Sequence, residues 1–187
     1  MVLSHDEQLK LKRTVTLKEI PHWKVDSLYI LTGYRRPQES WRGCLQSIYA
    51  FVHNETGNIH THLWGGILFL YFLFTADPSK LTSGPTTWVD SAVFSVFFAS
   101  AIFCLLSSAA FHTLLAHHSR EVVSCCNAFD YVGIIVLTDG SFYPLLYYGF
   151  FCEPKTLALY ASTTVFLGSA TAFVVVDPKY AEPTHIA

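Results

Sequence analysis

Residues 91–115, SAVFSVFFASAIFCLLSSAAFHTLL, decide the fold, because this stretch is long enough to cross a membrane. A helix of roughly 20 apolar residues spans the hydrocarbon core of a bilayer, and these residues include no Asp, Glu, Lys or Arg. The stretch ends in polar groups, since Ser107 and Ser108 are followed by His112. These groups are either a polar helix end that reaches water or the edge of a functional site.

The composition of the whole chain also indicates a membrane protein. Of the 187 residues, 51% are hydrophobic and only 14% are charged, whereas about a quarter are charged in a soluble domain. No basic patch is present to hold a nucleic acid, and the net charge of −2 gives no other indication of partners. The five cysteines have no CxxC spacing or regular framework, so we expect free thiols. The pair Cys125–Cys126 lies near an expected membrane face, where acylation is the alternative to unmodified thiols.

Four windows reach spanning length, and short connections join them. They are residues 57–76, 91–115, 131–151 and 156–176. In the last window Thr164, Gly168 and Ala172 recur every fourth position, which permits close contact between helices. The sequence therefore predicts an all-α, multi-pass transmembrane helical bundle with about four spans.

The positive charges predict the orientation of this bundle. Eight of the twelve Lys and Arg residues precede the first span, and positive charge favours the cytosolic side. We therefore expect a mobile cytosolic tail at 1–27, which lacks the apolar segment of a signal peptide, and a second cytosolic tail at 177–187. The polar start of the first span, the end of the second and the start of the third then lie at the cytosolic leaflet.

Residues 28–56 are neither spanning nor disordered in composition. Trp41, Leu45, Ile48 and Tyr49 have the i, i+4, i+7, i+8 spacing of one helix face. This pattern predicts an amphipathic helix on the inner membrane interface, where Trp and Tyr are favoured.

His112 and Asp130 are the candidate metal residues. They stand at the end of the second window and the start of the third, so an antiparallel helix pair would place them at similar depth. A neutral imidazole is a common zinc ligand, and a nearby carboxylate can orient it or hold a water. Ser108 lies one turn before His112 on the same face. The alternative is that both groups are interfacial and touch only water or each other.

Other polar residues have simpler interpretations. We expect Glu55, His60 and His62 to satisfy helix ends and tie the first span to its neighbours, and we expect solvated loop positions for His117 and His118. Asp139 is the charge furthest into the membrane, where an acid is a functional candidate by default. Nine residues of helix separate it from Asp130 and turn it to the opposite face, so we favour a neutral, hydrogen-bonded, structural role.

Several motifs in order resemble the progestin and adipoQ receptor family, which includes adiponectin receptors and the more distant haemolysin III group. The motifs are TGYRRPQES (32–40), HNETGNIHTHL (53–63), SSAAFHT (107–113), FDYVGI (129–134) and GSFYPLLYYGF (140–150). The resemblance implies a seven-helix bundle with a cytosolic N-terminus and a zinc site in the cytosolic leaflet. In that family the zinc ligands are a histidine on the second helix, an H-x3-H pair on the seventh helix, and an aspartate on the third helix that acts through water. His112 matches the second-helix histidine, and Asp130 matches the third-helix aspartate.

The same resemblance implies a ceramide-type amide hydrolase. The zinc-bound water would attack the amide carbonyl, and Ser108, which matches the family serine, could stabilise the oxyanion. The implied partners are a membrane lipid such as ceramide or a sterol, an extracellular protein ligand, and a homo- or hetero-oligomer. The implied location is the plasma membrane or the endoplasmic reticulum.

Two departures from the family pattern limit this expectation. The loop after His112 is one residue longer than usual, and these 187 residues contain no H-x3-H pair. We therefore expect the N-terminal four-helix portion of a seven-helix protein, with an incomplete zinc site and no hydrolase activity by itself. Three alternatives remain open: a receptor with purely structural zinc, a short form that pairs through the small-residue face of 156–176, and a zinc site of His60, His62 and His112.

Overall fold

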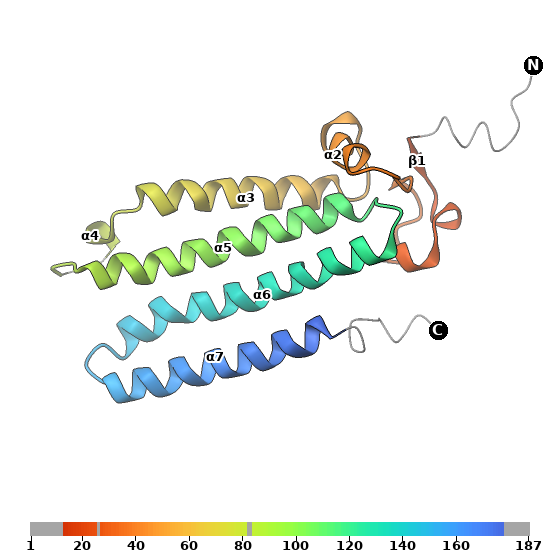
Figure 1. Ribbon diagram of the computed structural model, residues 1–187. Coiled ribbons are helices and arrows are strands. Elements are labelled where there is room, and N and C mark those ends of the chain that lie inside the picture. Colours follow the sequence, from red (N-terminus) through yellow and green to blue (C-terminus); the bar gives the residue numbers. More distant parts are fainter. Residues whose placement is uncertain (1–12, 26, 82–83, 178–187) are drawn as a thin grey trace, which may run out of the picture.

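The computed structural model describes residues 13–25, 27–81 and 84–177 (Figure 1). Four long helices lie side by side in chain order and alternate in direction. They are α3 (Thr56–Thr75), α5 (Trp88–Leu114), α6 (Arg120–Gly149) and α7 (Pro154–Val176). The short helix α4 (Pro78–Leu81) lies in the connection between α3 and α5. This arrangement confirms the predicted all-α multi-pass bundle.

Within the described residues, three helices are long and apolar enough to cross a membrane: α5, α6 and α7. The 20-residue helix α3 carries Asn58, His60 and His62 in its first turns, which lower its mean hydropathy. Along α7, all of which is described, no side chain is buried, and Phe166 and Phe173 are largely exposed. In a bilayer such apolar surface faces lipid or further helices.

Small residues allow α5, α6 and α7 to pack closely. A Cβ atom added to Gly133 of α6 would lie 2.9 Å from the Cα atom of Cys104 on α5. Gly168 of α7 lies against the carboxylate of Asp139 on α6, where an added Cβ would be 2.1 Å from Oδ2. Part of the small-residue face of α7 is therefore already in contact with α6 inside this chain.

At the end of the bundle opposite α2, a polar contact joins α5 to α6. Asp90 accepts hydrogen bonds from the backbone N–H and the hydroxyl of Thr87 at 2.7 and 2.8 Å, which caps the start of α5. Its second carboxylate oxygen accepts the hydroxyl proton of Tyr148 at 2.7 Å. This contact fixes α6 against the first turn of α5.

The start of α6 differs from the prediction. The helix begins at Arg120 rather than at residue 131, so most of the connection expected between the windows 91–115 and 131–151 is helical. The hydroxyl of Ser119 accepts the N–H of Val122 at 3.4 Å and caps the helix, and Val123 is buried. Polar residues in 120–128 suggested a loop, but they occupy the exposed side of a helix that continues past the apolar window. The other ends of the long helices lie within one turn of the predicted bounds.

The segment before α2 is folded in its described part, which differs from the predicted mobile tail at 1–27. Strands β1 (Thr14–Val15) and β2 (Tyr34–Arg35) pair antiparallel, with Val15 opposite Tyr34. Between them are the 3-10 helices η1 (Leu17–Glu19) and η2 (His22–Lys24). Val15, Ile20 and Tyr34 form a small buried cluster, and burial of this apolar surface holds the segment in place. Residues 1–12 and the predicted tail from 178 onward lie outside the described residues.

The predicted amphipathic helix is α2 (Trp41–Ala50). Ser40 caps it by accepting the N–H of Gly43 at 3.2 Å. Its inner face is formed by Cys44 and Ser47, both buried, which pack toward the end of α5. Trp41, Leu45 and Tyr49 are exposed on the other face, which leaves the predicted interfacial surface open.

Candidate functional site

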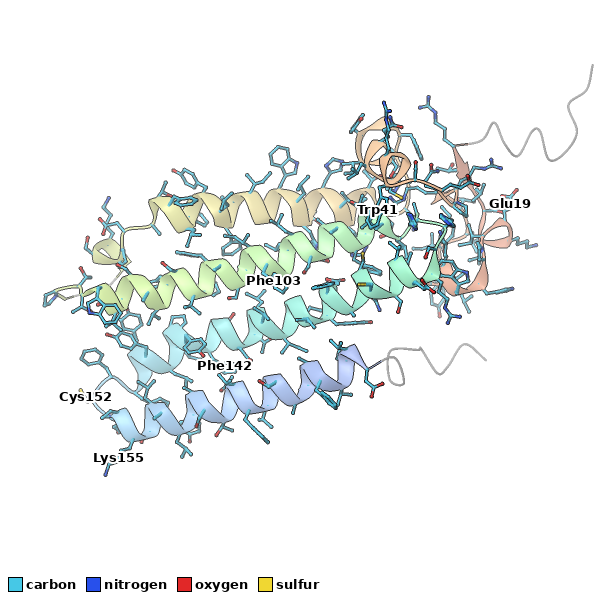
Figure 2. All side chains as sticks on the ribbon, viewed as in Figure 1. Glu19, Trp41, Phe103, Phe142, Cys152 and Lys155 are labelled. Atoms are coloured by element: carbon cyan, nitrogen blue, oxygen red, sulfur yellow. The ribbon has the colours of Figure 1, made fainter. Side chains whose placement is uncertain are left out.

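Polar side chains gather where the start of α3, the end of α5, β2 and α2 meet. Figure 2 shows nitrogen and oxygen atoms concentrated at this end of the bundle, near Trp41, whereas the long helices carry mainly carbon. We call this region the polar end. It contains two of the three residues singled out from the sequence, Ser108 and His112, which lie one turn apart on α5.

The central contact of the polar end joins α3 to α5. Glu55, the N-cap residue of α3, is 3% exposed. Its Oε2 atom lies 2.8 Å from Nδ1 of His112 and accepts the side-chain N–H of Asn58 at 2.9 Å. Asn54 donates to the other carboxylate oxygen. Glu55 therefore ties the first long helix to the second, as the sequence interpretation expected of it.

This contact determines the tautomer of His112. Burial by itself raises the pKa of Glu55, but hydrogen bonds from His112 and Asn58 outweigh it and hold the pKa below its ordinary value. Glu55 is thus a carboxylate at neutral pH and only accepts hydrogen bonds. Nδ1 of His112 must then carry the proton, and in the neutral ring Nε2 carries a lone pair.

A second histidine stands beside this pair. Nδ1 of His62 lies 2.7 Å from the hydroxyl oxygen of Ser108. The rings of His62 and His112 meet edge to face with centroids 5.7 Å apart. His60, also on α3, contacts the carbonyl oxygen of Ile48 in α2 through Nε2 at 3.0 Å. The two α3 histidines therefore have different partners, and only His62 lies against His112 and Ser108.

Arg35 closes the polar end from the side of β2. This residue is 5% exposed. Its guanidinium donates to the carbonyl oxygen of Thr113 and the hydroxyl of Ser47, both at 2.9 Å, and to the carbonyl oxygen of His112. The carbonyls belong to the last turn of α5, where no intrahelical donor reaches them. Burial lowers the pKa of Arg35 to about 10, so it remains a cation at neutral pH, and its positive charge helps to keep the pKa of Glu55 low.

Sequence reasoning did not assign Arg35 a role and did not connect Glu55 to His112. Both residues lie in motifs quoted for the family resemblance, at 32–40 and 53–63. That was the available signal, but nothing in the local spacing relates either motif to the end of α5.

His53 is a buried neutral base in the same network. Its Nε2 lies 3.2 Å from the carbonyl oxygen of Ser47, and its Nδ1 accepts the backbone N–H of Glu55 at 3.2 Å. Burial, followed by the charge of Arg35, lowers the pKa of His53 to about 4. The imidazole is therefore neutral at pH 7 and donates through Nε2.

The turn after α5 is more ordered than the sequence suggested. His117 is 5% exposed, because the ring of Trp41 lies 5.3 Å from its own and Gln38 pairs with this segment. Nζ of Lys24 donates to the carbonyl oxygen of His117 at 2.7 Å. The prediction of a solvated position was thus wrong for His117, while His118 is exposed as expected.

Asp130, the third residue singled out, does not open α6 but lies well inside it. Gly133, less than one turn further, packs against Cys104 and Ser107. Because α5 and α6 are antiparallel, this register puts the backbone of Asp130 close to the level of Ser107 and Ser108. The similar depth expected for Asp130 and His112 stays a prediction, and the carboxylate hydrogen-bonded to His112 is that of Glu55. Asp139 lies two turns further along α6, against α7.

The polar end matches a zinc site in one respect and not in another. A metal-binding histidine usually donates its second ring nitrogen to a carboxylate, as His112 does to Glu55. A structural or catalytic zinc site needs three or four protein ligands, and the described residues contain no group of three His, Cys, Asp or Glu side chains that could hold a metal. The alternative site of His60, His62 and His112 is likewise not formed there.

Comparisons with known proteins agree with the resemblance seen in the sequence. A family profile described as haemolysin-III related matches residues 51–186. The adiponectin receptor protein of Drosophila melanogaster is 41% identical over 170 residues, which cover 89% of this chain and 36% of the relative.

Two further relatives have similar coverage. The progestin and adipoQ receptor-like protein 1 of Caenorhabditis elegans is 36% identical over 172 residues, covering 91% of this chain and 38% of the relative. The human progestin and adipoQ receptor family member 3 is 30% identical over 168 residues, which cover 90% of this chain and 53% of the relative. The chain therefore spans about half or less of the length of these relatives.

Proposed function

The chain belongs to the haemolysin-III-related family of receptor-like membrane proteins, and on that premise we propose that its polar end is part of a zinc-dependent lipid amide hydrolase site. The proposal includes a cytosolic N-terminus, which the excess of Lys and Arg before α3 supports. Its substrate class is a ceramide-like amide. A sterol, an extracellular protein ligand and a second subunit are further partners within the same proposal, in the plasma membrane or the endoplasmic reticulum.

The observation that carries the proposal is the hydrogen bond between Glu55 and His112. It leaves Nε2 of His112 as the free lone pair that a zinc ion requires. When bound, zinc supplies Lewis acidity that polarises an amide carbonyl. Asp130 would accept a proton, and the hydroxyl of Ser108 would donate to the carbonyl oxygen of the substrate.

The number of ligands limits what this chain does by itself. Within the part of the chain that the structure describes, one imidazole and one more distant carboxylate form a weak site, since a stable zinc site needs three or four protein ligands. We therefore expect the isolated chain to bind zinc with a Kd weaker than about 10 μM and to hydrolyse no ceramide.

Nitrogen NMR of histidine-labelled protein in detergent tests the ligand. We expect saturating zinc to shift Nε2 of His112 while Nδ1 keeps its proton, and His112→Gln to remove this shift. His118→Gln, which changes an exposed histidine outside the Glu55 contact, should leave it in place. A zinc-induced loss of the Nδ1 proton, or no shift at His112, would refute the assignment.

The second candidate function is a non-catalytic receptor in which zinc is structural. It is favoured by the bond between Ser108 and His62, which engages the hydroxyl in tying α5 to α3. The two functions can be separated in a chimera that joins this chain to the unmatched part of the Drosophila relative. Loss of ceramide hydrolysis in Asp130→Asn, with Asp139→Asn active, supports the hydrolase. Equal turnover in both variants refutes the role of Asp130, and a chimera that binds zinc but hydrolyses no ceramide supports the receptor.

A further inference from the structure

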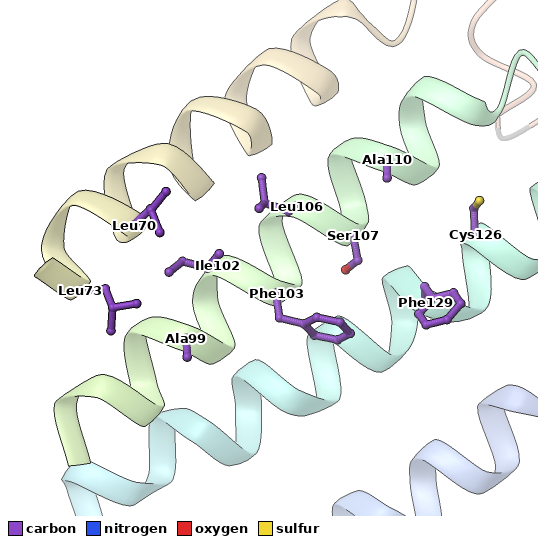
Figure 3. Close-up of a pocket in the computed structure, with 10 residues that line it drawn as sticks. All are labelled: Leu70, Leu73, Ala99, Ile102, Phe103, Leu106, Ser107, Ala110, Cys126 and Phe129. Atoms are coloured by element: carbon purple, nitrogen blue, oxygen red, sulfur yellow. The ribbon is translucent and has the colours of Figure 1, made fainter. Parts of the chain in front are cut away.

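An apolar groove of about 630 Å³ runs along α5 between α3 and α6. Figure 3 shows Leu73 and Ala99 at one end of the groove and Ala110 and Cys126 at the other. Ala99 and Ala110 are eleven residues apart on one helix, which corresponds to about 16 Å. The groove is therefore long and narrow rather than round.

The lining consists almost entirely of hydrocarbon. Only Ser107 and Cys126 contribute side-chain heteroatoms among the lining residues. The hydroxyl of Ser107 donates to the carbonyl oxygen of Cys104 at 3.0 Å, so it does not face a ligand as a donor. Cys126 is a free thiol. The groove thus offers one free thiol, at one end of an apolar channel.

The place of Cys126 along the bundle is fixed by its neighbours. It packs against the buried cluster of Cys44, Leu114 and Ala116, where α2 meets the end of α5. The thiol therefore lies close to the polar end, and the groove extends from it toward the interior of the bilayer. Cys125, the adjacent residue, is exposed and does not line the groove, because successive helix positions differ by about 100°.

We propose that Cys126 is S-acylated and that its acyl chain lies in the groove between α3, α5 and α6. The acyl chains of one leaflet extend about 15 Å, half of a hydrocarbon core of about 30 Å, which matches the length of the groove. The donor is an acyl-coenzyme A thioester. The sulfur of Cys126 attacks the acyl carbon, its new bond replaces the bond to the coenzyme A sulfur, and coenzyme A leaves as a thiol that carries the cysteine proton.

Metabolic labelling with an alkynyl fatty acid tests this proposal in the full chain expressed in eukaryotic cells. Hydroxylamine, which cleaves thioesters, should release the label from the wild type. Cys126→Ser should lose the label, whereas Cys125→Ser and Cys152→Ser should keep it. Label that stays in Cys126→Ser, or that is missing from the wild type, overturns the proposal.

A second pair of variants tests whether the acyl chain occupies the groove. Ala99→Phe fills the end of the groove distant from the thiol and should reduce labelling without changing any cysteine. Ala158→Phe places the same ring on an exposed position of α7 and should not. Equal labelling of both variants would overturn the placement of the chain.

The inference rests on the proposed cytosolic side of the polar end, which has its own measurement. An N-glycosylation acceptor placed between α4 and α5 is modified only if that connection faces the lumen. Glycosylation with no fatty-acid label refutes acylation alone, and an unmodified acceptor refutes the orientation.

Discussion

Replacing Arg35 by Met gives a large predicted loss of stability. The guanidinium satisfies the carbonyl oxygens of His112 and Thr113 and the hydroxyl of Ser47, and it balances the buried charge of Glu55. Leaving a buried acceptor without its donor costs about 1–3 kcal/mol, so the two carbonyl oxygens together lose about 2–6 kcal/mol. With about 2–4 °C of Tm for each kcal/mol in a chain of this size, we expect Tm to fall by about 10 °C.

Thermal unfolding of the purified chain in detergent, followed by circular dichroism, measures the effect. Arg36→Met is the matched control, because Arg36 is the adjacent arginine and its side chain is partly exposed. The stability change should be local to the polar end. The thiol of Cys44, which is 0% exposed on the inner face of α2, should therefore react with maleimide faster in Arg35→Met, as measured by peptide mass spectrometry.

The reasoning would be refuted if both variants melted at the same temperature. It would also be refuted if Arg35→Met lost stability but left Cys44 as unreactive as in the wild type, because the loss would then lie elsewhere. Arg35→Lys provides a further comparison. One ammonium group cannot reach all three acceptors as the planar guanidinium does, so this variant should fall between the wild type and Arg35→Met.

Three other predictions follow from the described contacts. The pKa of His53 is about 4 in the folded protein and 6.5 in the unfolded chain, so the stability that its neutral imidazole contributes is complete above pH 6.5 and is lost as the pH falls through 4. We therefore expect the Tm of His53→Gln to drop less than the wild-type Tm between pH 6.5 and pH 4. An equal drop in both proteins would contradict this assignment. Gly133→Ala should lower Tm, because the added Cβ would clash with the backbone of α5. Gly149→Ala should raise Tm slightly, because its Cβ enters open space and alanine has the higher helix propensity. A change of Tm in the same direction for both variants would be inconsistent with the packing. Tyr148→Phe should lower the free energy of unfolding by about 1.5–3 kcal/mol, because it removes the hydrogen bond to the carboxylate of Asp90. Denaturant unfolding measures this loss, with Tyr147→Phe as the control. Equal unfolding midpoints for the two variants would argue against the contact.

Hydropathy and helical spacing were sufficient to predict the long helices and one face of the polar end. A bilayer requires about 20 apolar residues for each spanning helix, so four apolar windows marked α3, α5, α6 and α7 within about a turn at most ends. Ser108 and His112 could be placed together because residues four apart share a helix face. These predictions depend only on local sequence.

The partners of those residues depend on the tertiary structure. Glu55 and His112 are 57 positions apart, and Arg35 is 78 positions from Thr113, so only the packing of β2 and the start of α3 against the end of α5 brings them together. The register of α6 is a second example. Apolar residues reveal that a helix is long enough to cross the membrane but not its register along a neighbouring helix, which is set here by the close packing of Gly133 against Cys104 and Ser107. Local sequence determined which residues form helices, whereas packing between distant segments decided which polar groups meet.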